Sequence, residues 1–163
     1  MSEDEKIAEK EIKKAKAVFA TLCEMLDERD WHYQKDEERL TVSCGAQGED
    51  LPIELRIEVD IKRRLIVLLS QMPFVVGEKR RAAMAVAVSK ANDGTVDGNF
   101  DYDYLGGRIV FRMTSSYLES LIGKELFNYM LMCACVTVDR YNDKFLMVAK
   151  NEMTFEEILD FID

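Results

Sequence analysis

The sequence predicts an α+β fold in which helices pack mainly on one face of an antiparallel sheet of five strands. The chain opens with apolar residues at helical spacing, short segments of alternating apolar and polar residues then follow one another, and the last third returns to helical spacing. Adjacent strands with few helices between them are typical of antiparallel sheets. The expected element order is α-β-β-β-α-β-β-α-α.

Residues 4–28 are predicted to form the first helix. Its apolar residues recur at intervals of four and three and therefore share one stripe: Ala8, Ile12, Ala15, Phe19, Leu22 and Leu26. Glu and Lys occupy the opposite side. We expect the apolar stripe to pack on the sheet.

Three strands are predicted next, over residues 40–46, 52–60 and 64–72. The second alternates apolar residues with Glu54, Arg56, Glu58 and Asp60, which indicates one buried and one solvated face. The third is apolar on both faces, with Leu65, Val67 and Leu69 on one and Ile66 and Leu68 on the other. One of these two stripes must interrupt the polar face of the sheet, unless a terminal helix over residues 155–162 covers it.

The remaining elements alternate between helix and hairpin. Residues 77–92 have helical spacing, and residues 99–104 and 108–113 form a hairpin through a diglycine turn. A long apolar helix is expected over residues 124–148, followed by a short C-terminal helix within residues 154–163. Without an internal repeat or a linker, residues 1–163 are interpreted as a single domain.

Composition excludes several classes of function. The 163 residues include 31 acidic and 22 basic side chains, so the net charge is −9, which disfavours nucleic acid binding. Residues 1–60 hold 17 acidic and 9 basic groups, or −8, and the remainder holds 14 and 13, or −1. The charged N-terminal segment and the short apolar runs predict a cytoplasmic protein without a membrane span. The four cysteines are then expected as free thiols.

No motif in the sequence predicts catalysis, a metal or a cofactor. Residues 93–104 resemble a calcium loop, but Tyr104 stands where a bidentate Glu is needed. His32, the one histidine, has no nucleophile motif beside it. The basic triplets at residues 62–64 and 79–81 lack a glycine-rich loop, so they are interpreted as solvated, with an anion or an acidic partner segment as the alternative. We therefore expect that the protein is not an enzyme.

Exposed apolar surface rimmed by charge is a usual mark of protein contact. The interrupted polar face therefore predicts a partner-binding site formed by the third strand and the hairpin: Leu65, Ile66, Val67, Leu68, Tyr102, Tyr104 and Arg112. The alternative is a small-ligand-binding or enzymatic domain with a polar pocket lined by Tyr102, Tyr104, Arg112 and His32. A deep closed pocket would favour the ligand site, and a shallow groove would favour the protein site.

The element order, the stretch NDGTVDGNFDYDYLGGRIVFRM and the later VDRYNDKF resemble the YbjN family. These bacterial domains are labelled sensory transduction regulators, and their fold is similar to that of type III secretion chaperones. The resemblance covers residues 5–148 and includes Asn92, Gly98, Phe100, Gly107, Phe111, Asp139 and Tyr141. It implies a non-enzymatic, protein-binding adaptor with a regulatory or chaperone-like role. The implied partner is another protein or a second copy of the chain.

Overall fold

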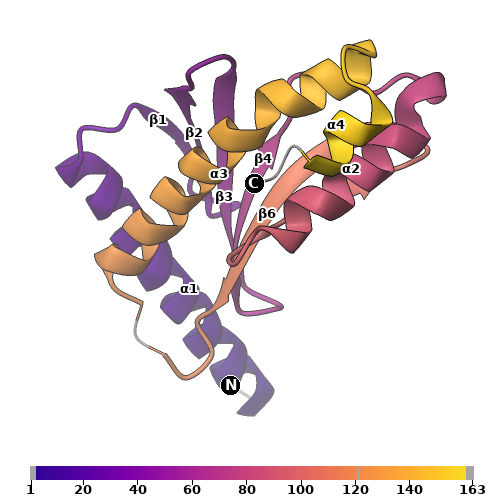
Figure 1. Ribbon diagram of the computed structural model, residues 1–163. Coiled ribbons are helices and arrows are strands. Elements are labelled where there is room, and N and C mark those ends of the chain that lie inside the picture. Colours follow the sequence, from indigo (N-terminus) through magenta and orange to yellow (C-terminus); the bar gives the residue numbers. More distant parts are fainter. Residues whose placement is uncertain (1–2, 121, 161–163) are drawn as a thin grey trace.

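The computed structural model describes residues 3–120 and 122–160, with side chains from Ala8 onward (Figure 1). The elements are α1 (Glu3–Glu28), β1 (Tyr33–Asp36), β2 (Thr41–Gln47), β3 (Pro52–Asp60), β4 (Leu65–Gln71), the 3₁₀ turn η1 (Glu78–Arg80), α2 (Arg81–Asp93), β5 (Asn99–Asp103), β6 (Arg108–Ser116), α3 (Lys124–Lys150) and α4 (Phe155–Asp160). The strands form one antiparallel sheet in the order β1-β2-β3-β4-β6-β5. The predicted α+β class with an antiparallel sheet is confirmed.

Within the described ranges the sheet has six strands, so the prediction of five is wrong. The strand that the sequence did not reveal is β1, whose Tyr33 pairs with Cys44 and whose Asp36 pairs with Thr41. β1 lies at the edge of the sheet and three of its four residues are exposed. Because it buries no face fully, it lacks the alternation of apolar and polar residues that reveals a half-buried strand.

The predicted helices are present with small differences at their ends. The second helix starts with η1 before α2, and α3 continues two residues past the predicted end at residue 148. The C-terminal helix begins with a capping box, in which the Thr154 N–H donates to Glu157 Oε2 and the Glu157 N–H donates to Thr154 Oγ1. Of this predicted segment, residues 161–163 lie outside the described residues.

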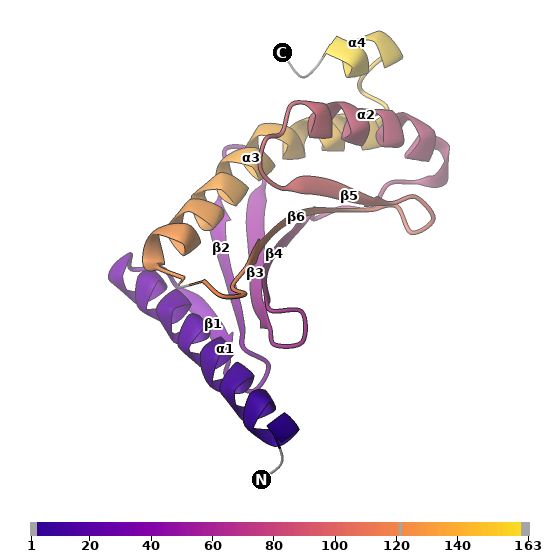
Figure 2. The ribbon, with the colours of Figure 1, turned by 90° about the horizontal axis from the view of Figure 1, so that it is seen from below.

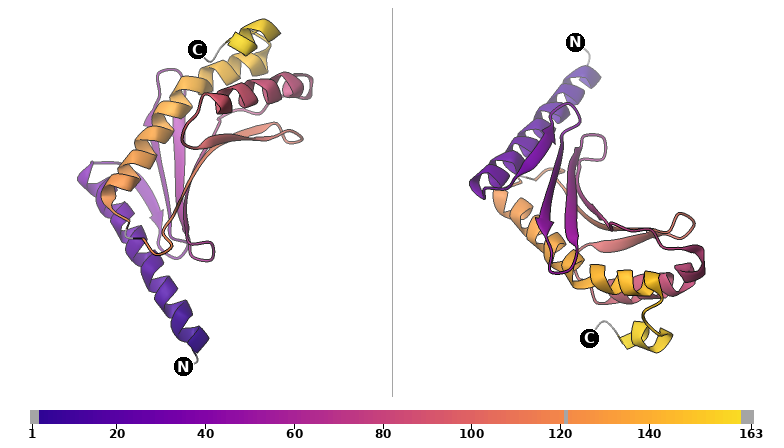
Figure 3. Two further views of the ribbon diagram at one scale, coloured as in Figure 1. Left: turned by 60° about the horizontal axis from the view of Figure 1, so that its bottom comes forward. Right: turned by 90° about the horizontal axis from the view of Figure 1, so that it is seen from above.

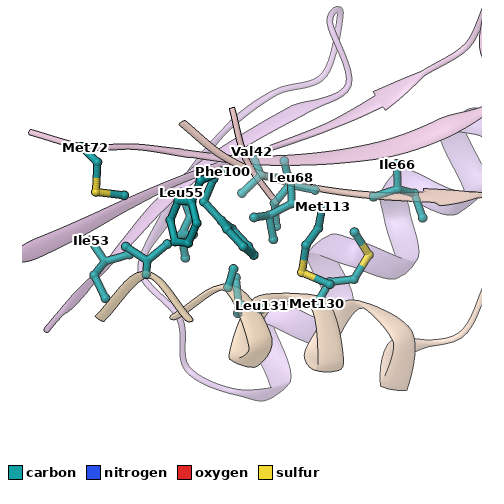
Figure 4. Packing of buried hydrophobic residues seen from close by; sticks show 14 of the residues in the cluster. Val42, Ile53, Leu55, Ile66, Leu68, Met72, Phe100, Met113, Met130 and Leu131 are labelled. Carbon is teal, nitrogen blue, oxygen red and sulfur yellow. The ribbon is translucent and has the colours of Figure 1, made fainter. Parts of the chain in front are cut away.

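The core lies between one face of the sheet and the helices α1, α2 and α3. Apolar side chains of β3, β4 and β6 alternate into it, and each of the three helices adds one buried stripe. Met113 of β6 points toward Met130 of α3, while Leu131 lies below Leu68 (Figure 4). No described helix is both long and apolar enough to cross a membrane.

On the opposite face of the sheet, no helix lies among the residues that the structure describes. Figure 2 shows α1, α2 and α3 on one side only, and α4 packs on α2 on that same side. The sequence left open whether the C-terminal helix covers the polar face of the sheet. The described part of this helix, α4, does not cover it. Figures 2 and 3 show that the sheet bends between β3 and β5, with the helix-free face on the inside of the bend. We call this concave surface the open face.

Two polar side chains tie loops to this framework. The Phe100 N–H donates to Asn92 Oδ1 at 2.7 Å, and Asn92 Nδ2 donates to the Phe100 carbonyl at 3.0 Å. The amide of Asn92 thus blocks the outer edge of β5. Asp139 of α3 accepts a hydrogen bond from the Glu49 N–H at 2.8 Å and so anchors the β2–β3 turn.

Candidate functional site

The apolar stripe on the open face comes from alternate residues of β4. Leu65, Val67 and Leu69 are half-buried and project to this face, whereas Ile66 and Leu68 are 0% exposed and lie in the core. The structure thus distinguishes the two stripes that the sequence left open. Of the four β4 residues predicted to contact a partner, Leu65 and Val67 lie on the open face, and Ile66 and Leu68 are not available there.

A row of side chains crosses the open face beside this stripe. The strand register places Gln34, Ser43, Arg56, Leu69 and Arg112 side by side, from β1 to β6. Leu69 therefore stands between two arginines. The row crosses five strands, and Leu69 is its apolar member. This arrangement is the polar face with an apolar interruption that the sequence predicts.

Each arginine on the open face has a carboxylate partner of its own. Arg112 binds Asp101 through two hydrogen bonds, Nε to Oδ2 at 2.6 Å and Nη2 to Oδ1 at 3.1 Å. These bonds hold the pKa of Asp101 below its ordinary value and raise that of Arg112. Arg108 binds Asp103 at 2.8 Å, and Arg56 lies 3.6 Å from Glu58.

The net charge of the open face is negative, because its carboxylates outnumber its arginines. The strand positions that project to it carry six carboxylates, Asp36, Glu54, Glu58, Asp60, Asp101 and Asp103, against three arginines, so 3 − 6 = −3. All three arginines are already engaged within the chain. The face therefore presents an apolar stripe with net negative charge around it, which is complementary to a basic, partly apolar surface.

A shallow hollow of about 940 Å³ occupies the part of the open face between β1 and β6. Leu69 and Val110 supply apolar lining, and His32, Glu54 and Arg56 supply polar lining. Sequence reasoning missed the contribution of β1 to this hollow, because the strand itself was missed. The hollow is more open than enclosed, which suits a protein segment better than a small ligand.

The polar residues of the alternative ligand pocket do not converge. Tyr102 pairs with Ile109 in the register and lies on the helix-covered face, where burial raises its pKa. Tyr104 is 51% exposed at the β5–β6 turn, with its ring centroid 6.2 Å from that of Tyr102. Arg112 and His32 are on the open face. Among the described residues, no group of three or more His, Cys, Asp or Glu side chains is arranged to hold a metal ion.

Comparison with known proteins agrees with this architecture. Residues 19–147 match the model of a family described as "YbjN: Putative bacterial sensory transduction regulator". The crystal structure of YbjN from E. coli, "a putative transcription regulator", is similar with a TM-score of 0.54 at 12% sequence identity, over 82% of this chain and 90% of that chain. At this identity the likeness shows the fold alone. No curated protein matches the chain.

Proposed function

Because this chain belongs to the YbjN family, we propose that it is a regulatory domain that works by binding another protein on the open face of its sheet. The observation that carries the proposal is the helix-free, concave surface with the apolar stripe Leu65, Val67 and Leu69 inside an acidic rim. The partner segment would bring apolar side chains to the stripe and Lys or Arg side chains to the rim.

The outer edge of β1, with which no described strand pairs, offers a second means of holding an extended segment. The Val59 N–H donates to the Leu40 carbonyl at 3.0 Å, which fixes the alternation of hydrogen bonds through β2. By that alternation Gln34 turns its backbone groups toward β2, and Tyr33 and Lys35 turn theirs away from the sheet. An extended partner could pair with these groups, which is the usual route of strand addition. Holding a partner in this way would give the domain a chaperone-like role.

Selection from a phage-displayed peptide library, followed by anisotropy titrations of the selected peptides, tests this proposal. We expect selected peptides that combine apolar residues with Lys or Arg, bind the full chain and weaken as salt is added. Leu69→Lys should weaken binding at least about tenfold, because it places a cation among the partner's cations and removes apolar contact. The matched control is Leu105→Lys, at a position 81% exposed on the β5–β6 turn and away from the stripe.

Two outcomes would overturn the proposal. One is the selection of acidic or purely polar peptides, because their charge does not suit the rim. The other is equal affinity of the selected peptides for the wild-type chain and for Leu69→Lys. Circular dichroism of both variants checks that the fold is retained.

A further inference from the structure

An exposed apolar stripe lies on α3, on the side of the helix that faces away from the sheet. Tyr129, Met132 and Val136 are 50%, 48% and 64% exposed, and their spacing of three and four places them on one stripe of the helix. Val96, in the loop between α2 and β5, is 98% exposed. Sequence reasoning missed this surface because α3 is apolar around most of its circumference. The sequence alone therefore does not separate the apolar residues on the exposed side of the helix from those that pack in the core.

A hollow lies beside these residues. Its volume is about 220 Å³, and it is lined by the loop from Gly94 to Asp97 and by α3 residues that include Tyr129, Val136 and Arg140. The protruding Val96 and the hollow therefore belong to one surface. We call this surface, made of Val96, Asp97, Tyr129, Met132, Val136 and Arg140, the α3 patch.

The α3 patch carries one charge of each sign. Asp97 accepts a hydrogen bond from the Tyr129 hydroxyl, which raises the pKa of Tyr129 to about 12. Arg140 is exposed, with its guanidinium 5.6 Å from the centre of the Tyr141 ring. Residues 61–163, to which the whole patch belongs, have a net charge of only −1, against −8 for residues 1–60. Two copies of this acidic protein can therefore approach each other through this half with little repulsion.

We propose that the α3 patch is the interface between two copies of the chain. In a two-fold symmetric pair the same patch serves both copies, so each surface must complement itself. Val96 of each copy would enter the hollow of the other, and Arg140 of each would pair with Asp97 of the other. From Tyr129 to Met147, which is 38% exposed, the outer side of α3 spans about 27 Å, enough for two antiparallel helices to pack along several turns.

This pairing is independent of partner binding on the open face. The α3 patch lies on the solvent side of a helix whose other side packs on the sheet, so the two surfaces face away from each other. One copy could use both at once, and loss of one interaction leaves the other in place.

Sedimentation equilibrium of the full chain from micromolar to millimolar concentration is the first test. We expect a dimer, and we expect Val136→Arg and Met132→Lys each to raise the dissociation constant at least about tenfold, because each buries a charge in the contact. Both positions are exposed, so the fold should be kept, and a thermal melt verifies this. Val75→Arg, at a position 62% exposed outside the patch, is the matched control. A wild-type monomer at every concentration, or a dimer insensitive to both patch variants, overturns the proposal.

A charge exchange identifies the symmetry of the contact. Arg140→Asp alone and Asp97→Arg alone each place like charges opposite one another and should weaken the dimer. In an equimolar mixture of the two variants, both cross-pairs join an acid to a base, so a mixed dimer should form. Failure of the mixture to associate better than either variant alone overturns the reciprocal pairing.

Discussion

Replacement of Asn92 by Ala should destabilise the protein by removing the group that blocks the edge of β5. The Asn92 amide makes two hydrogen bonds to the backbone of Phe100, at 2.7 and 3.0 Å. Phe100 is 2% exposed, and its ring packs on Phe111, Tyr141 and Phe145 at centroid distances of 5.1, 5.5 and 5.0 Å. The unpaired groups would therefore lie next to the centre of the core.

The expected loss of unfolding free energy is about 2–3 kcal/mol. Each backbone group left without its partner costs about 1–3 kcal/mol when it stays dry. Asn92 is only half-buried, so water can replace part of what is lost. Ala also favours a helical position by roughly 0.5 kcal/mol over Asn, which offsets a further part.

Urea unfolding followed by circular dichroism measures this loss, and hydrogen exchange locates it. The exposed neighbour Asp93 provides the control, because Asp93→Ala should change stability by no more than about 0.5 kcal/mol. The amide of Phe100 should lose protection in Asn92→Ala. If stability stays within about 0.5 kcal/mol of the wild type, or if the Phe100 amide keeps its protection, the explanation of Asn92 as an edge block is wrong.

Three further outcomes are expected. Ile66→Glu should abolish cooperative unfolding at neutral pH, because it places a charge at a position 0% exposed. Val67→Glu, on the open face, should fold. If both variants fold, the assignment of the two faces of β4 is wrong. The pKa of Asp101 is lowered in the fold by Arg112, so its pairing stabilises above the unfolded pKa of about 3.9 and is lost as the pH falls through the folded value. Unfolding titrations should thus show a smaller fall in stability below about pH 4 for Asp101→Asn than for the wild type. Burial raises the pKa of the Cys44 thiol to about 12, so Cys44 should react slowly with maleimide at pH 8 while the chain is folded. Mass spectrometry measures the labelling with and without guanidinium. Equal labelling rates of Cys44 in the folded and the unfolded chain would contradict this expectation.

Alternation and helical spacing predicted most of the fold because most elements have one buried side. Strand β3 alternates without interruption from Ile53 to Asp60, and its bounds match the prediction. The capping box of α4 was likewise readable, since Thr154 and Glu157 are polar residues at a fixed spacing. Local patterns of this kind need no knowledge of distant parts of the chain.

The features that escaped prediction depend on contacts between distant segments. β1 is a strand because its backbone pairs with β2, while its side chains remain largely in solvent. The choice between the two stripes of β4 depends on which face the helices cover, and the two stripes are nearly equal in hydrophobicity. The α3 patch forms because the loop at Val96 lies beside Val136, which is 40 residues away in the sequence.

The distribution of charge connects these surfaces to the proposed function. A net charge of −9 would oppose every self-association if it were spread evenly, but −8 of it belongs to residues 1–60. Those residues form α1 and the strands β1, β2 and β3, which supply Asp36, Glu54, Glu58 and Asp60 to the open face. The exposed apolar stripe of α3 lies instead in the nearly neutral part of the chain. A chain arranged in this way can attract a basic partner at the open face and accept its own copy at the α3 patch, because residues 61–163, which hold that patch, carry a net charge of only −1.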